Sequence, residues 1–415
     1  MKILYITPFQ HPALGGSTRC YLADGHRMAT VHRKSSTEAY GGSSLEHVDY
    51  DIHGLVGIRL INPSISDAAA VARQLGPLQS PLSREPDIVV RFVKQLPTPN
   101  LRYLGPKTHG FTDNGYFILR SSKQEARVKV AFEEIGKQCE IVCENGLRSV
   151  PLLMAILNLT ALKKDCVSLH ASAFNYKDTG VLVTGWAKGG KTEALLAFAL
   201  HGAEYVGDEW ILLSGDGQNM YGVPENIRLW DWHLEYLSHV RRQVGTQERL
   251  LFKGIQWLDR LQQAIPNGRI GKTFAVRTVR EAMPALRRQL NVCVAPRTIF
   301  GCGFGSLTGR PEKLFLMVSH QDSSIAIEPS DPLSIARRMM SAIRYEQLPL
   351  MEHYLAFKYA FPGKDNDFID NAHQRQMDIL CRALAGKEAY TVRHPHPVSL
   401  HDLYASMRPF VEQRA

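Results

Sequence analysis

The stretch GVLVTGWAKGGKT, from Gly180 to Thr192, decides the fold of this chain. It begins with a short apolar run and ends in G-x-x-x-x-G-K-[ST], the pattern of a phosphate-binding loop. Glycines let such a loop turn tightly and aim successive backbone N–H groups at phosphate oxygens. The helix that we predict from Lys191 to about Leu200 adds its N-terminal amides and its dipole. The stretch therefore predicts an α/β fold with a nucleotide-phosphate site between a strand and a helix.

The loop residues have distinct expected tasks. Lys191 reaches the β and γ phosphates, and the Thr192 hydroxyl joins the coordination shell of Mg²⁺. The sequence therefore predicts ATP and Mg²⁺ as cofactors. The residues that we expect to bind the nucleotide are Gly185, Trp186, Ala187, Lys188, Gly189, Gly190, Lys191 and Thr192.

Acidic residues and one histidine surround this motif in the sequence. Glu193 falls in the first turn of the predicted helix, as either a helix-stabilising acid or a ligand of Mg²⁺ or its water shell. Asp208 and Glu209 follow a short strand and come soon after the loop, although acids of this type usually follow a longer apolar run. His170 ends the strand before the loop strand; a lone histidine there is more often a packed, hydrogen-bonded residue than a functional one.

In this order, several segments resemble the catalytic domain of HPr kinase/phosphorylase, a member of the phosphoenolpyruvate-carboxykinase-like P-loop fold. The matching segments are Leu169–Ala173, Gly180–Gly185, Gly190–Glu193, Gly202 and Val206–Glu209. Glu209 stands where the family usually has Asp, and the family's Gly-Arg-Asn-rich segment is not recognisable. The resemblance is therefore to an HPr-kinase-like protein and does not imply HPr as the substrate.

The resemblance implies a role for each matching residue. Asp208 would act as the general base, Glu209 would support the base or the metal, and His170 would lie near the transferred phosphate. Thr192, Glu193 and Glu209 would hold Mg²⁺. The implied activity is that of an ATP-dependent kinase that transfers the γ-phosphoryl group to a hydroxyl, on a serine of a peptide or protein.

Other functions remain open at this stage. An ATP-binding regulatory module without transfer is favoured if the acidic pair stays away from the loop. A small-molecule kinase of the carboxykinase-like class is favoured if the pocket is too narrow for a peptide. Residues 1–19 also resemble the opening of a two-domain glycosyltransferase. Arg337, Arg338 and Arg344 fall on a predicted helix, where they form either a phosphate-binding group or an exposed basic face.

The pattern along the chain predicts a leader at 1–50, a small α+β domain at 51–148 and a P-loop domain at 149–415 with a C-terminal helical extension. We expect a helix that Ser66 caps and that runs through Leu75, strands at Ile88–Val93 and Ala126–Ile135, and a helix from Pro332 to about Ile343. Residues from about 366 onward are expected to be helical.

Composition limits the remaining choices. The 415 residues are 44% hydrophobic and 21% charged, as in ordinary globular proteins. We find no apolar run of about 18 residues, so we expect no membrane span and a cytoplasmic protein. The net charge is +9. Nine basic residues stand against two acids between Arg269 and Lys313, but no nucleic-acid motif accompanies them, so nucleic acid is not an expected partner.

The seven cysteines are scattered and odd in number, which favours reduced thiols over a zinc site at Cys139 and Cys143. The acceptor is not identified by the sequence, and a homo-oligomer remains open.

Overall fold

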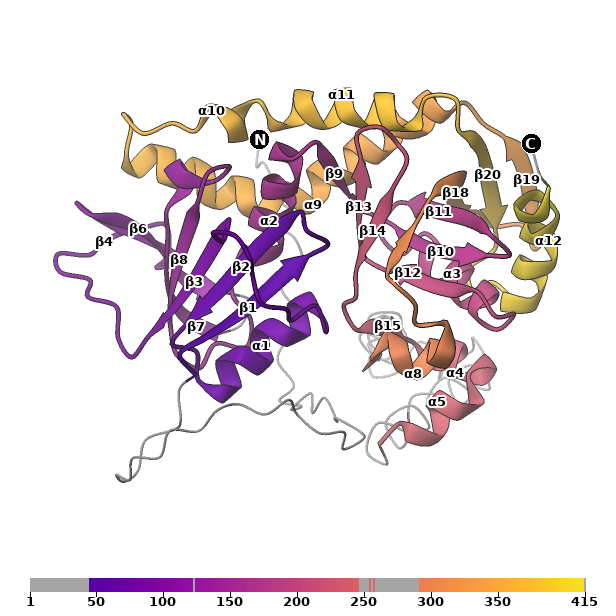
Figure 1. Ribbon diagram of the computed structural model, residues 1–415, viewed down its shortest axis with the longest axis horizontal. Helices are drawn as coiled ribbons and strands as arrows, with labels where there is room; N and C mark the ends of the chain where they lie inside the picture. The colour runs from indigo at the N-terminus through magenta and orange to yellow at the C-terminus, as the bar shows by residue number, and fades with distance from the viewer. Residues whose placement is uncertain (1–44, 122–123, 246–253, 255–256, 258–290, 414–415) are drawn as a thin grey trace, which may run out of the picture. The chain divides into compact units, whose positions relative to one another are not determined.

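The computed structural model of the protein describes residues 45–121, 124–245, 254, 257 and 291–413 (Figure 1). Within these residues the chain has the mixed α/β fold that the sequence predicts, built from several sheets. The glycosyltransferase-like opening at 1–19 and nearly all of the predicted leader lie outside the described residues. So do residues 269–290 of the basic stretch that begins at Arg269.

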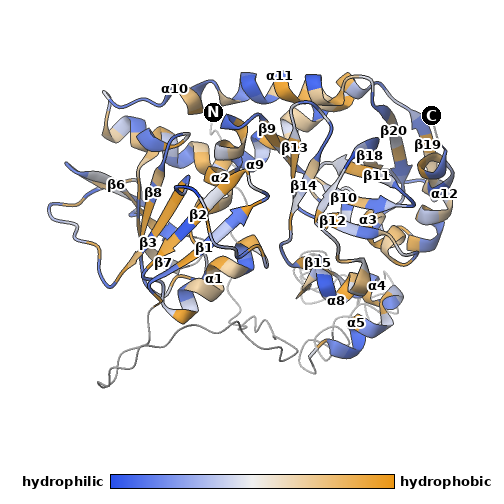
Figure 2. Cartoon of the chain, viewed as in Figure 1, coloured by the Kyte–Doolittle hydropathy of each residue, from blue (hydrophilic) through white to orange (hydrophobic). Residues whose placement is uncertain are grey.

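The N-terminal part of the described chain forms an eight-stranded mixed sheet, in the order β1-β2-β3-β8-β7-β6-β5-β4. Neighbours are parallel from β2 through β3 to β8 and antiparallel elsewhere. The strands are β1 His47–Ile52, β2 Val56–Ile61, β3 Ile88–Val93, β4 Arg102–Leu104, β5 His109–Thr112, β6 Gly115–Ser121, β7 Gln124–Val130 and β8 Cys139–Glu144. β3 has the predicted bounds, and its β-branched residues give the sheet an apolar interior (Figure 2).

Two local predictions in this region need correction. α1 spans Ile65–Leu75, and its N-cap is Ser64, not Ser66. The Ser64 hydroxyl accepts a hydrogen bond from the Asp67 amide at 3.2 Å, and the Asp67 carboxylate accepts one from the Ser64 amide at 3.2 Å, which forms a capping box. The strand expected to reach Ile135 ends at Val130, because the chain turns there into the short 3₁₀ helix η1, Phe132–Glu134.

The phosphate-loop motif belongs to a six-stranded sheet with the order β12-β10-β11-β18-β20-β19. β11, β18 and β20 are parallel, and the outer pairs are antiparallel. The strands are β10 Ser172–Tyr176, β11 Thr179–Gly185, β12 Glu204–Gly207, β18 Pro311–Ser319, β19 Ala326–Pro329 and β20 Glu388–His394. α3, Lys191–Ala199, packs on β10 and β11, and α12, Leu400–Glu412, packs on α3.

A four-stranded antiparallel sheet lies next to it, in the order β17-β14-β13-β9, and β15 pairs with β16. Their bounds are β9 Cys166–His170, β13 Trp210–Ser214, β14 Met220–Val223, β15 Ile227–Leu229, β16 Val292–Val294 and β17 Thr308–Gly309. The short helices of this region are α4 Asp231–Tyr236, α5 Ser238–Gln243, α8 Pro296–Phe300 and η3 Gly301–Gly303.

Three helices connect these sheets. α2, Leu153–Lys163, is buried along most of its length and packs against β9 and β2. α9, Pro332–Ala360, packs against β5, β6, β9 and β11, and α11, Ala372–Leu384, packs against α9 and α2. One hydrophobic cluster therefore runs from the first sheet through these helices to β9 and β13.

The C-terminal third differs from the sequence prediction in two ways. α9 does not end at Ile343 but continues to Ala360, because buried residues recur at helical spacing through Leu350, Tyr354 and Phe357. The region after 366, predicted as helical, contains the strand β20, whose sequence EAYTVRH alternates in burial from Tyr390 onward and includes β-branched and aromatic residues.

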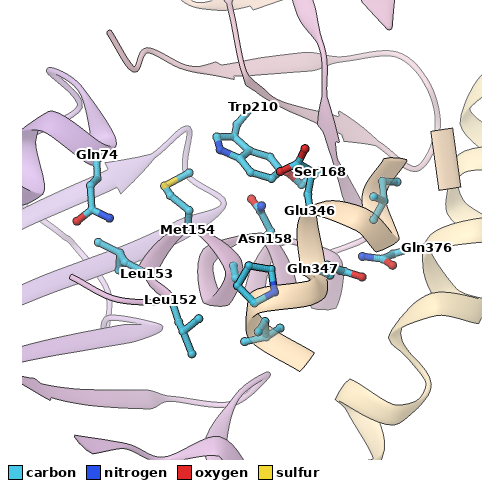
Figure 3. A pocket seen from close by; sticks show the side chains of 14 residues that line it. Gln74, Leu152, Leu153, Met154, Asn158, Ser168, Trp210, Glu346, Gln347 and Gln376 are labelled. Atoms are coloured by element: carbon cyan, nitrogen blue, oxygen red, sulfur yellow. The ribbon is translucent and has the colours of Figure 1, made fainter. Parts of the chain in front are cut away.

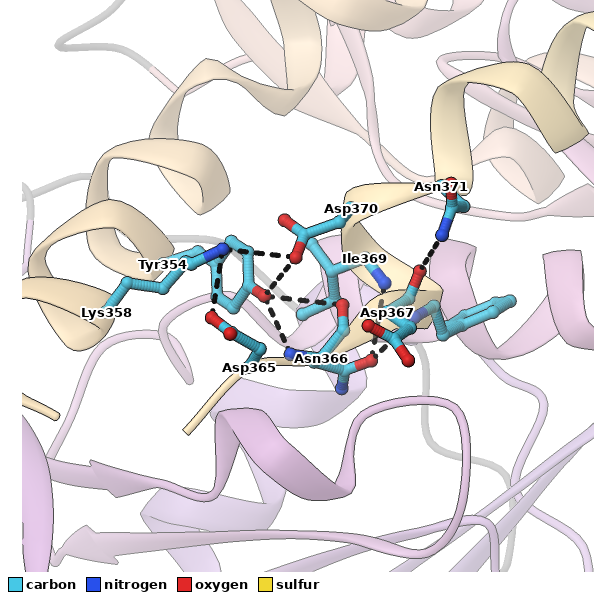
Figure 4. A network of polar contacts seen from close by, with 9 residues as sticks. Tyr354, Lys358, Asp365, Asn366, Asp367, Ile369, Asp370 and Asn371 are labelled. Atoms are coloured by element: carbon cyan, nitrogen blue, oxygen red, sulfur yellow. Dashed lines mark hydrogen bonds and ion pairs between the residues drawn. The ribbon is translucent and has the colours of Figure 1, made fainter. Parts of the chain in front are cut away.

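A compact polar network ends α9 and begins α10, Asp367–Asp370 (Figure 4). Asn366 caps α10 by accepting hydrogen bonds from the Phe368 and Ile369 amides at 3.0 and 3.3 Å. Its side-chain amide donates to the carbonyls of Phe132 and Ile135 at 2.8 and 2.9 Å. This single buried side chain therefore joins the start of α10 to the η1 turn that follows β7.

Candidate functional site

The loop between β11 and α3 has the backbone of an anion cradle. Lys188 and Gly190 have positive φ angles of 63° and 103°, and Gly189 between them does not. Backbone that alternates in this way turns successive N–H groups into one concavity, which attracts negative charge. The loop also closes on itself, since the Gly189 amide donates to the Trp186 carbonyl at 3.0 Å.

Lys191 is the buried cation of the loop, with 5% of its surface exposed. Its Nζ donates to the carbonyls of Trp186 and Gly185 at 3.1 and 3.4 Å. Burial lowers the pKa of Lys191, and the charges of Glu209 and Asp208 oppose that shift. Among the described residues no carboxylate forms an ion pair with Lys191, so loop carbonyls hold its ammonium group.

Asp208 directly follows β12, and its side chain reaches the start of α3. It is 3% exposed, and it accepts a hydrogen bond from the Thr192 hydroxyl at 3.1 Å and a closer one from the Ser172 hydroxyl. Burial, and then the charge of Glu209, raise the pKa of Asp208 to about 6, while the two hydroxyl groups oppose the shift. The acidic pair therefore lies beside the loop, as the sequence predicts.

His170 joins two carboxylates that are distant in sequence. Its Nε2 lies 2.9 Å from Glu209 Oε2, and its Nδ1 lies 2.8 Å from Glu346 Oε1 on α9. Burial alone would lower the pKa of His170, but the hydrogen bonds to Glu209 and Glu346 outweigh it and raise the pKa to about 9. The imidazole is therefore charged at neutral pH and neutralises part of the acidic group.

Glu209 occupies an unusual backbone position, because its φ is 73° and it is not a glycine. Such a conformation costs on the order of 1 to 3 kcal/mol and persists only where surrounding contacts hold it. Burial would raise the pKa of Glu209, but the hydrogen bond and charge of His170 lower it. Glu225 stands nearby, and burial together with the charge of Glu209 raises its pKa to about 8.

The predicted metal ligands are not gathered at one point. Thr192 faces Asp208, Glu209 faces His170, and the Glu193 carboxylate lies 3.1 Å from His233 Nε2. Burial would raise the pKa of Glu193, but the contact with His233 lowers it. In the residues that the structure describes, no group of three or more His, Cys, Asp or Glu side chains is arranged to hold a metal ion.

The structure brings two residues to the site that no sequence motif indicates. Glu346 follows the arginines on α9 and contacts His170 across 176 positions of sequence. His394, at the end of β20, is fully buried, and its Nε2 lies 2.9 Å from the Gly189 carbonyl. Neither contact follows from local spacing. The order of motifs along the chain gives no sign of either.

The side chain of Trp186 lies on the exposed part of the loop, as does that of Lys188. It is 54% exposed, and its ring centroid lies 5.0 Å from that of Tyr345 on α9. Arg337, Arg338 and Arg344 are exposed on the same helix, as an ordinary basic helix face would be.

Two basic residues of the 269–313 stretch and two cysteines have contacts or burial that serve the fold. Lys313 is buried and forms an ion pair with Glu388, and the Arg310 guanidinium donates to Gln218 at 2.7 Å. Cys139 and Cys143 are buried thiols of β8, and burial raises the pKa of both. Neither residue belongs to a metal-binding group among the described residues.

No model of a known protein family matches this chain, and no curated protein matches it. Among the described helices, none combines the length and apolar character needed to cross a membrane.

Proposed function

We propose that this chain is a P-loop phosphotransferase that binds ATP at residues 185–192. The observation that carries the proposal is the contact between Thr192, at the start of α3, and Asp208, at the end of β12. A phosphate loop alone would fit many nucleotide-binding proteins. A buried carboxylate against the loop hydroxyl adds a group suited to metal binding or proton transfer. The closeness of Asp208 to the loop also argues against the alternative of an ATP-binding regulatory module without transfer.

More particularly, we propose an HPr-kinase-like serine kinase of the phosphoenolpyruvate-carboxykinase-like class. The succession of His170, the loop and the acidic pair supports this, and so does their convergence in space. The acceptor hydroxyl would belong to a serine of a peptide or protein. A small-molecule acceptor is the alternative within the same class.

The loop residues would bind and orient the nucleotide. Backbone N–H groups of residues 186–192 and the Lys191 ammonium would hold the β and γ phosphates. Lys191 suits this task because its hydrogen bonds go to loop carbonyls. The exposed Trp186 would lie at the mouth of this cradle.

The residues present fit Mg²⁺ in part. The Thr192 hydroxyl and the adjacent Asp208 carboxylate match the Ser/Thr and Asp pair with which P-loop proteins hold this ion. Glu193 and Glu209 are turned toward histidines and do not complete that set. When bound, Mg²⁺ would neutralise phosphate charge.

Asp208 would also be the proton acceptor of the reaction. The acceptor oxygen would bond to the γ-phosphorus as the bond from that phosphorus to the bridging oxygen breaks, and ADP would leave. The hydroxyl proton would pass to the Asp208 carboxylate, whose pKa, raised to about 6, is close to the pH at which a base works efficiently. The charged His170 would offset the negative charge of Glu209 near the incoming phosphate.

A transfer assay over a Mg²⁺ series tests the proposal and separates the two roles of Asp208. Purified full-length protein is given labelled ATP and a lysate of the source cells, and the labelled acceptor is identified. Lys191→Ala should weaken ATP affinity by about 10- to 150-fold, because a charge-assisted contact is worth about 1.5 to 3 kcal/mol. Asp208→Asn should bind ATP normally and lose about 10²- to 10⁴-fold in transfer rate.

The effect of added Mg²⁺ on the transfer rate of Asp208→Asn shows whether Asp208 acts as a base or only as a metal ligand. If Asp208 is the base, added Mg²⁺ does not restore transfer in Asp208→Asn. Restoration by Mg²⁺ would make Asp208 a metal ligand only. Unchanged ATP affinity in Lys191→Ala, measured by calorimetry, would remove the loop from the proposal.

A further inference from the structure

The outward face of α9 begins beside the phosphate loop. The ring centroid of Tyr345 lies 5.0 Å from that of Trp186, and the two residues are 48% and 54% exposed. The next residue, Glu346, is turned to the inner side of the helix, where it lines a cavity with Trp210 of β13 and holds His170 at 2.8 Å (Figure 3). An acceptor that reaches the loop past Trp186 would therefore lie along the outward face of α9.

This outward face is basic and has no acid of its own. Arg337, Arg338 and Arg344 are exposed. With Tyr345 they occupy about a third of the circumference of the helix, because successive residues are about 100° apart. From Pro332 to Tyr345 the helix contains these three arginines and neither aspartate nor glutamate. Among the described residues none of the three guanidinium groups forms an ion pair or a side-chain hydrogen bond. Unpaired cations gathered on one face attract an anionic partner.

The spacing of the arginines indicates the form of that partner. A planar guanidinium group binds a carboxylate with two parallel hydrogen bonds. Arg338 is seven residues from Tyr345, which is about 10 Å along a helix with a rise of about 1.5 Å per residue. An extended peptide advances about 3.3 Å per residue, so it covers this distance in about three residues. A small hydroxyl compound held at the loop would not reach Arg338, whereas an acidic peptide would.

We propose that the acceptor is an acidic peptide segment that binds along Arg337, Arg338, Arg344 and Tyr345 of α9 and against Trp186 of the loop. This inference rests on the proposed kinase function and names the substrate class of the same site. The two aromatic rings pack against the residues next to the acceptor serine. The arginines bind carboxylates that lie three or four residues away from that serine.

Binding of synthetic peptides to the full-length protein, without nucleotide, tests the substrate class. Each fluorescent peptide has one serine in an alanine and glycine sequence, with aspartate, asparagine or lysine at the third and fourth positions either before or after the serine. By anisotropy we expect an aspartate peptide to bind at least fivefold more tightly than its asparagine counterpart, and the lysine peptides not to bind. The side on which aspartate is preferred gives the direction of the bound peptide. Equal affinities of the aspartate and asparagine peptides on both sides overturn the proposal.

A pair of arginine variants locates the binding face. Arg337→Gln together with Arg338→Gln should remove the preference for aspartate and leave the affinity for the asparagine peptide unchanged. Arg241→Gln together with Arg242→Gln is the matched control, because these adjacent arginines are exposed on α5 and their loss changes the net charge equally. The control should bind every peptide as the unchanged protein does, and both double variants should keep the melting temperature. Equal weakening in the two variants would show that the peptide responds only to net charge, which refutes the site.

A single-stranded oligonucleotide with as many negative charges as the aspartate peptide is the competing anion. If it binds more tightly than the peptide and is lost in the same α9 variant, the face belongs to nucleic acid and the proposal is overturned. Failure of the proposed kinase activity is distinguishable, because the peptide measurements use no ATP. Absence of transfer with an intact aspartate preference would reject the kinase, whereas transfer to an acceptor without acidic residues would reject only this binding face.

Discussion

Burial shifts the pKa values of Asp208 and His170 in opposite directions, whereas the charge of Glu209 raises both. Burial, and next the charge of Glu209, make the ionised form of Asp208 less favourable than in water and raise its pKa to about 6. His170 has carboxylates on both ring nitrogens, so its protonated form is stabilised and its pKa rises to about 9. Between these two values Asp208 is ionised and His170 is charged.

This pair predicts a bell-shaped pH profile for phosphoryl transfer. The rate should rise as pH increases through about 6, because Asp208 loses its proton and becomes able to accept another. It should fall as pH increases through about 9, because neutral His170 no longer offsets Glu209 and Glu346. Single-turnover rates between pH 5 and pH 10, at saturating ATP, would record both limbs.

His170→Gln separates the two limbs of this profile. The transfer rate of this variant should still rise with pH through about 6 but should not fall through about 9, and its maximum should be lower than that of the unchanged protein. An alkaline limb that persists in this variant would assign it to a different group, and an acid limb well below pH 5 would remove the link to Asp208.

At the scale of the elements, the loop between β11 and α3 depends on close packing against β20. A Cβ at Gly190 would come within 2.3 Å of His394 Nε2, and the φ of 103° is unfavourable for any residue with a side chain. Gly190→Ala should therefore destabilise the protein by about 2 to 4 kcal/mol. Urea unfolding gives the comparison with Gly202→Ala, where φ is 82° but nothing lies within 4 Å. That control should lose only about 1 kcal/mol, from backbone strain alone; equal losses would show that contact with His394 is unimportant.

The junction between α9 and α10 gives a second prediction at this scale. Asn366→Ala removes the two hydrogen bonds that Oδ1 accepts at the α10 cap and the two that the amide donates to the carbonyls of Phe132 and Ile135, and it leaves buried backbone groups unpaired. We expect a loss of about 3 to 4 kcal/mol in the free energy of unfolding. Asn371→Ala is the control, since its exposed side chain makes one hydrogen bond to the Asp367 carbonyl, and it should lose under about 1 kcal/mol.

At the scale of the whole molecule, the shared hydrophobic cluster predicts cooperative unfolding of the described residues. The cluster contains residues of β3 and β8 as well as residues of α2, β9, β13 and α9. All five tryptophans fall between 186 and 257, so their fluorescence reports only on the later part of the chain. Hydrogen exchange at β3 and β8 should therefore collapse at the same denaturant concentration as the fluorescence change. Exchange of those strands while fluorescence remains native would instead show that the predicted domain at 51–148 unfolds on its own.

The local elements of the fold are the part that the sequence predicts well. The run before Gly185 is a strand, Lys191 begins a helix, and Ile88–Val93 is a strand, because these depend on apolar periodicity and glycine placement within a few residues. Boundaries are harder to predict, as α9 shows: the helix expected to end near Ile343 continues through Pro349 to Ala360, because buried residues recur in the later turns. The strand β20 was missed because its pairing with β18 is a contact between distant parts of the chain.

The sequence by itself determined the phosphate loop, the acidic pair and the histidine as candidates, since each is a chemical type at a recognisable spacing. Only the tertiary structure decided their partners. It turned Glu193 toward His233, brought Glu346 to His170 and set His394 against the loop. It also placed Tyr345 of α9 against Trp186 of the loop. The physical reason is that charge pairing and burial depend on distance in space, and no local pattern encodes contacts between residues separated by many elements.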